Sequence, residues 1–104
     1  MQITDIQSQM DEFVRSNGWY KTDSQKPQTA KNLSISLALE ASELLECFQW
    51  TDRGDTPSVE DELADVVLYA AQIANVMAID LDAVIERKLA SNRERKWMTA
   101  GMEE

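Results

Sequence analysis

The stretch that decides the fold is TAKNLSISLALEASELLECFQW, residues 29–50. Its apolar side chains, plotted at 100° per residue, fall into two separate sectors of a helix. The first sector holds Leu33, Leu37, Ala41, Leu44 and Phe48, and the second holds Ile35, Leu39 and Trp50. We therefore expect a long helix from about Thr29 to Trp50. Because so much of its circumference is apolar, we expect a partner subunit to cover the second sector.

The helical period continues on both sides of this stretch. Apolar residues from Ile3 to Val14 predict a first helix that closes near Asn17-Gly18, where glycine can adopt the left-handed cap conformation. Residues 19–28 are predicted to form a loop, and residues 51–57 a turn. No strand alternation and no internal repeat is present.

Two further helices follow the turn. Pro57 suits the first position of a third helix running to about Met77, with a core stripe that includes Leu63. Asp80 is a plausible N-cap for a fourth helix that continues into the nineties. Four helices with short connections predict an all-α, four-helix bundle-type fold, with residues 1–104 as one domain and the long second helix as the oligomer contact.

Four carboxylates interrupt the apolar runs in two pairs, Glu40 with Glu43 and Glu62 with Asp65. Residues three apart project from one side of a helix, so each pair offers two oxygen ligands in one direction. Carboxylates set among apolar side chains have raised pKa values unless they are paired or metal-bound. Oxygen ligands from two facing helices suit Mg²⁺ with phosphate oxygens as further ligands. The alternative is that these acids lie on solvated helix faces or favour a helix N-terminus through its dipole.

The composition excludes several classes of protein. A net charge of −9 argues against a nucleic-acid duplex or an anionic membrane as partner, since both require a basic surface. The single cysteine, Cys47, rules out an internal disulfide framework and is interpreted as a packing residue in a reducing compartment. No signal or membrane segment is evident, so a cytoplasmic location is expected.

Histidine is absent from the chain. Histidine-based zinc sites, Ser-His-Asp triads and imidazole acid–base catalysis are therefore excluded. Any chemistry has to use carboxylates, a metal ion and water.

Three features of the sequence carry a resemblance: the spacing of the acidic pairs, FQW at residues 48–50, and DLDAVIERKLASNRERKW at residues 80–97. Together they resemble the MazG-like nucleoside triphosphate pyrophosphohydrolases of the all-α NTP pyrophosphatase superfamily. Trp19, ahead of an Asn32-Leu33 step, is similar to the dCTP pyrophosphatase-like branch. The resemblance spans nearly the whole chain.

The resemblance implies a role for individual residues. Those matching the family's Mg²⁺ ligands, with Mn²⁺ as a possible substitute, are Glu40, Glu43, Glu62 and Asp65. Those matching contacts to the base, sugar or phosphates are Trp19, Asn32, Trp50, Tyr69, Lys88, Asn92 and Arg93. Five of the ten basic residues lie between Arg87 and Lys96, a clustering that favours a polyphosphate ligand. The alternative is that these cations complement a helix C-terminus.

The implied reaction is Mg²⁺-dependent hydrolysis of a (deoxy)nucleoside triphosphate at its α–β linkage, giving a monophosphate and pyrophosphate, in the role of nucleotide-pool house-cleaning. Glu43 or Glu46 would orient or deprotonate the attacking water, and Lys88 would stabilise the leaving pyrophosphate. A homo-oligomer, either dimer or tetramer, is the expected assembly.

Two other functions remain open at this stage. One is a non-catalytic acidic helical module that dimerises and regulates a partner. The other is a different enzyme of the same superfamily, acting on dUTP or on phosphoribosyl-ATP.

Overall fold

The computed structural model describes the backbone of residues 1–99 and the side chains of residues 1–95. Its helices are α1 (Ile3–Ser16), α2 (Ala30–Glu46), α3 (Thr56–Val76) and α4 (Leu81–Thr99). No strand occurs within residues 1–99, so the all-α prediction is confirmed.

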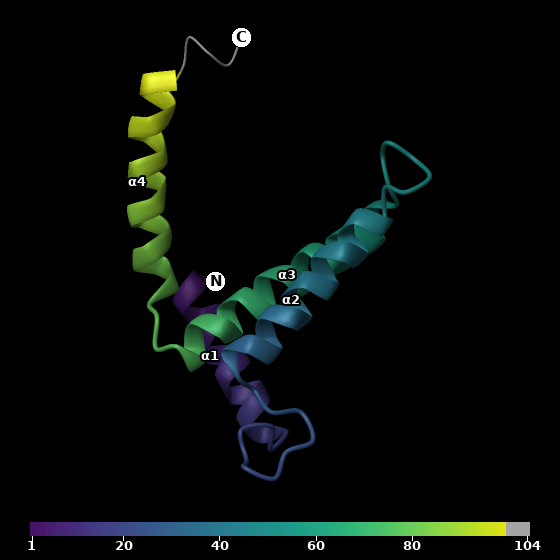
Figure 1. The fold of residues 1–104 in the computed structure, drawn as a ribbon, viewed down its shortest axis with the longest axis vertical. Coiled ribbons are helices and arrows are strands. Elements are labelled where there is room, and N and C mark those ends of the chain that lie inside the picture. The colour runs from purple at the N-terminus through teal and green to yellow at the C-terminus, as the bar shows by residue number, and fades with distance from the viewer. Residues whose placement is uncertain (100–104) are drawn as a thin grey trace.

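Helices α2 and α3 form the centre of the molecule and lie side by side (Figure 1). Helix α1 packs mainly on α3 near the end of the pair where α2 begins and α3 ends. Helix α4 leaves α3 at a bend of 110° and contacts α1, so it diverges from the α2–α3 pair (Figure 1). Within residues 1–95 no single helix is both long enough and apolar enough to span a membrane. Helices α3 and α4 reach that length and apolarity only when they are taken together as a bent pair.

The helix ends follow from local hydrogen bonds. The Thr29 hydroxyl accepts from the Asn32 amide at 3.1 Å and begins α2, while Asp55 accepts from the Ser58 amide at 3.2 Å and begins α3. The amide of Ala83 donates to the Asp80 carboxylate at 3.4 Å, as the sequence predicted for the start of α4. Gly18 has a φ of 70°, which confirms the left-handed turn after α1.

The predicted end of the second helix was wrong by one turn. Helix α2 ends at Glu46, because the Phe48 and Gln49 amides donate to carbonyls three residues back, Leu45 and Glu46. The Phe48 ring then folds over Gly54, whose φ is 67° and where a Cβ atom would lie 3.0 Å from the ring. Phe48, which the sequence placed in the first apolar sector of this helix, is 40% exposed and lies outside the core.

The core of one chain is small. Its fully buried apolar residues are Val14, Leu33, Ala71 and Ala74. Leu63, predicted for the core stripe of the third helix, and Met77, at the predicted end of that helix, are about half exposed because α4 does not return to cover α3. On α2, Ile35 and Leu39 are also more than half exposed, which fits the expectation of a second apolar face.

Candidate metal centre and adjoining pocket

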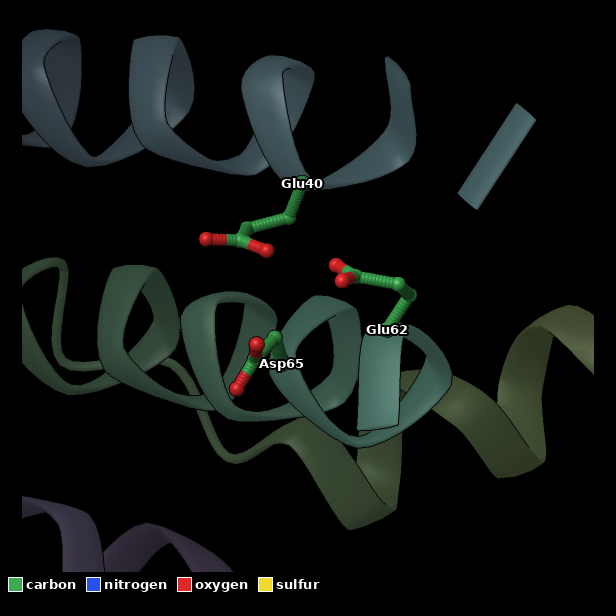
Figure 2. A group of neighbouring side chains, drawn as sticks. All are labelled: Glu40, Glu62 and Asp65. Atoms are coloured by element: carbon green, nitrogen blue, oxygen red, sulfur yellow. The ribbon is translucent and has the colours of Figure 1, made fainter. Parts of the chain in front are cut away.

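Three predicted metal ligands converge between the two central helices. Glu40 projects from α2 toward Glu62 and Asp65 on α3 (Figure 2). One carboxylate oxygen from each residue lies within 4.8 Å of the others. The three-residue step from Glu62 to Asp65 places both on the side of α3 that faces α2.

The remaining predicted acids lie further out. Glu43 is exposed on α2, and its carboxylate raises the pKa of both Glu40 and Glu62, so it faces the cluster from one side. Glu46 is exposed on the last turn of α2 and is not among the three converging residues. The structure thus distinguishes Glu43, which borders the cluster, from Glu46, which does not join it.

Desolvation and like charge act together on the carboxylates of this cluster. Desolvation, followed by the nearby carboxylates of Glu43, Glu62 and Asp65, raises the pKa of Glu40 to about 7. Desolvation and Glu43 also raise the pKa of Glu62. One oxygen of Glu40 and one of Glu62 are inaccessible to solvent and have no hydrogen-bond partner in the described part of the chain. An all-oxygen ligand set with two unpartnered buried oxygens fits a hard divalent cation such as Mg²⁺.

The raised pKa of Glu40 predicts how pH changes the stability of the metal-free protein. An unfolded glutamic acid releases its proton near pH 4.5, whereas folded Glu40 retains it to about pH 7. The folded state therefore binds more protons in this window, and the free energy of unfolding falls as pH rises through it. Urea melts in a chelator at several pH values should show this fall.

Two variants, one test and one control, show whether Glu40 causes this pH dependence. Glu40→Gln should reduce the pH slope, whereas Glu60→Gln, which alters an exposed acid on α3, should retain it. A slope that Glu40→Gln leaves unchanged would contradict the assignment.

Metal binding should stabilise the folded chain. A cation at tenfold excess over its Kd stabilises by about 1.4 kcal/mol, which corresponds to a Tm increase of roughly 6–11 °C for a domain of this size. Thermal melts with Mg²⁺ or Mn²⁺ against a chelator measure this shift. Glu62→Gln should reduce it and Glu60→Gln should not. Identical melting curves with and without millimolar Mg²⁺ would remove these carboxylates from a metal site.

A pocket of about 600 Å³ adjoins the carboxylates, and Asp65 belongs to both. Three residues predicted to contact a nucleotide, Trp19, Asn32 and Tyr69, line it together. The Trp19 ring meets the Phe13 ring edge-on at 5.5 Å between centroids, and the Lys26 ammonium lies 5.1 Å from the Trp19 ring. The pocket thus combines aromatic faces with amide groups beside the candidate metal centre.

Lys26, Gln28 and Gln72 are among the residues of this pocket that sequence reasoning missed. The first two lie in the loop before α2, where no periodicity indicates which side chains point inward. Gln72 is 2% exposed, although its residue type is usually exposed. Its one sequence signal is its place between the apolar residues Ala71 and Ile73 of α3.

Four predicted substrate contacts are not brought to the carboxylates within one chain. Trp50 follows the far end of α2 and is 88% exposed. Lys88, Asn92 and Arg93 are exposed on α4, which diverges from the α2–α3 pair (Figure 1). Their roles stay predictions, and Lys88 would have to reach a cluster belonging to another copy.

Comparisons with known proteins agree with this architecture. A model of the MazG-like family matches residues 35–103, so the chain belongs to the MazG-like family. The crystal structure of a pyrophosphatase from Archaeoglobus fulgidus superposes with a TM-score of 0.73 at 32% identity, over 88% of this chain and 89% of that one.

Curated relatives are more distant. The dCTP pyrophosphatase 1 proteins of mouse and human are 28% and 27% identical over 103 residues, which cover 89% of this chain. The chain spans 58% of the length of these relatives.

Proposed function

We propose that this protein is a Mg²⁺-dependent nucleoside triphosphate pyrophosphohydrolase that releases a (deoxy)nucleoside monophosphate and pyrophosphate. The observation that carries the proposal is the convergence of Glu40, Glu62 and Asp65 beside a pocket lined by Trp19 and Tyr69. Membership of the MazG-like family and similarity to proteins named as pyrophosphatases support the same reaction. Nucleotide-pool house-cleaning in the cytoplasm is the role that such a reaction would serve.

Different residues would bind the metal ion and activate the water molecule in this reaction. Glu40, Glu62 and Asp65 would hold the cation, with Glu43 at the border of the cluster. When bound, Mg²⁺ would supply charge stabilisation on the phosphate oxygens and lower the pKa of a water molecule. Glu43 would orient that water or accept its proton, and its exposed position facing the cluster supports this role. Glu46 remains the alternative base from the next turn of the helix.

The organic part of the substrate belongs in the adjoining pocket. Trp19 and Tyr69 offer aromatic surface to a base or sugar, and stacking on an aromatic side chain contributes roughly 1–3 kcal/mol per base in other nucleic-acid sites. Asn32 donates its side-chain amide to the Pro27 carbonyl at 3.0 Å, which holds it against the pocket wall. Asp65 joins the pocket to the metal ligands, so a triphosphate can extend from one to the other.

Pyrophosphate release from a panel of nucleoside triphosphates, with and without Mg²⁺, tests the activity. Glu62→Gln should lower kcat/KM by about 100-fold or more, because metal stabilisation of the transition state is several kcal/mol and each 1.36 kcal/mol is tenfold. Glu60→Gln, which neutralises a neighbouring exposed carboxylate, should retain activity.

The same panel separates the alternatives. If the well-folded protein releases pyrophosphate from none of the nucleotides, the result would favour the non-catalytic helical module. A response to dUTP or phosphoribosyl-ATP alone would favour the other enzymes of the superfamily.

We further propose that the active form is a homo-oligomer. Ile35 and Leu39 leave an apolar face on α2, and Leu63 and Val67 of α3 line an apolar groove of about 640 Å³ against α1. Contiguous apolar surface of this kind marks a protein interface. A second copy would cover these faces and could place its own Lys88 and Asn92 near the carboxylates that α4 of the first copy does not reach.

Two measurements test the assembly and its consequence. Sedimentation should show a dimer or tetramer that Leu39→Glu dissociates, whereas Ser34→Glu, a matched charge on another side of α2, should not. Mixed oligomers of Glu62→Gln and Lys88→Ala chains should regain activity that neither variant has alone, because one site then keeps both residues. A folded wild-type monomer at micromolar concentration would contradict the oligomer, and verified mixed oligomers without recovery would contradict the shared site.

A further inference from the structure

A buried amide lies in the wall of the pocket. Gln72 of α3 is 2% exposed, has Ala71 and Ile73 as chain neighbours, and lines the cavity with Leu33 and Leu68. An amide moved from water to apolar surroundings is unfavourable unless it is hydrogen-bonded. The identity of its hydrogen-bond partners therefore decides what this residue can do.

The orientation of the Gln72 amide is set by a chain of hydrogen bonds that begins at the backbone. The Gln28 side-chain Nε2 donates to the Lys26 carbonyl oxygen at 2.6 Å, and a carbonyl oxygen can only accept. The Oε1 atom of Gln28 is therefore the atom turned to Gln72, which donates to it through Nε2. Rotating the Gln72 amide by half a turn would set two oxygen acceptors against each other.

This orientation leaves a defined pattern for a ligand. Within residues 1–95, no hydrogen bond to Gln72 Oε1 is found, and Nε2 has a second hydrogen beyond the one donated to Gln28. The amide thus offers one acceptor and one donor, in an order that the Gln28 contact keeps from reversing.

Nucleobases differ in the groups that complement this pattern. Cytosine and adenine carry an exocyclic amino donor next to an unprotonated ring nitrogen, which is an acceptor. Uracil and hypoxanthine carry a carbonyl oxygen next to a ring N–H, so their donor and acceptor are interchanged. Against a base ring held in one position, a glutamine amide that cannot rotate is complementary to the first pair and mismatched to the second.

We propose that Gln72 recognises the base, its Oε1 accepting a hydrogen bond from an exocyclic amino group, and that Gln28 is the positioning residue that fixes the amide. The proposal rests on the proposed function only in taking the pocket to hold the base of a nucleotide. Amino-bearing bases should bind more tightly than their keto counterparts of the same ring size, because a mismatched base leaves a buried amide unpaired.

Equilibrium binding tests this without requiring turnover. Calorimetry with Mg²⁺ measures the Kd of non-hydrolysable α,β-imido triphosphates of deoxycytidine, deoxyuridine, deoxyadenosine and deoxyinosine. The wild-type protein should favour the amino member of each pair by about 10- to 100-fold, the range expected for leaving buried polar groups unpaired. Gln72→Met, which keeps the length but removes the amide, should reduce the preference to about threefold or less.

A second variant separates recognition from folding. Gln28→Met alters a half-buried loop residue and leaves Gln72 in place, so Gln72 can then rotate and pair with either type of base. The amino-over-keto ratio should fall while the Mg²⁺-induced Tm shift persists. Gln49→Met removes an exposed amide that lies outside the pocket and should change neither quantity.

The outcomes distinguish this proposal from the proposed activity. Hydrolysis accompanied by a wild-type preference for keto bases, or by a ratio that Gln28→Met and Gln72→Met leave unchanged, overturns base recognition by Gln72 alone. A ratio that both variants reduce, without hydrolysis of any triphosphate, supports recognition and overturns the activity. Failure of every nucleotide to bind overturns both.

Discussion

Carboxylates meeting across the α2–α3 contact are the constraint on which the rest of the structure depends. Glu40 and Glu62 place oxygens at the centre of the main helix pair, where apolar side chains would otherwise stabilise the contact. Desolvation, followed by neighbouring acids, raises the pKa of both residues, so their ionised forms are destabilised without a cation. A bound divalent ion would reverse this effect, since it would stabilise the ionised carboxylates and link the two helices at the same time.

A small core is the second consequence of this arrangement. Carboxylates occupy part of the α2–α3 contact, and α4 diverges from this helix pair. Few apolar residues in the described part of one chain are therefore fully buried. Much of the remaining apolar surface lies on α2 at Ile35 and Leu39 and along the groove beside Leu63. The candidate metal site and part of these apolar faces lie on α2 and α3. Oligomerisation and metal binding would therefore stabilise the same pair.

The sequence predicted the helices and the acidic cluster because both depend on local spacing. The step from Glu62 to Asp65 and the caps at Thr29 and Asp80 are set within one or two helical turns. The end of α2 escaped prediction because apolar residues continue to Trp50, while short-range hydrogen bonds at Phe48 and the turn at Gly54 end the helix sooner.

The direction of α4 and the wall of the pocket depend on contacts between distant residues. The bend after α3 is set partly by Gln7 of α1, whose side chain bonds Asn75 at 3.2 Å, the Ile79 carbonyl at 3.0 Å and the Leu81 amide at 3.1 Å. A helical wheel of a single segment contains no such information. The pairing of Gln28 with Gln72 joins a loop to a helix 44 residues away and was missed for the same reason.

The two parts of the site consequently differ in how they respond to sequence change. The candidate metal ligands lie on α2 and α3 and face each other through the register of those helices, so a substitution there would alter charge, metal binding and stability together. The adjoining pocket takes Trp19, Lys26 and Gln28 from the loop before α2 and meets α3 at Gln72. Loop substitutions would change the donor and acceptor order in the pocket without moving a candidate metal ligand. On the proposed function, base preference would therefore change within this fold while the carboxylate cluster is retained.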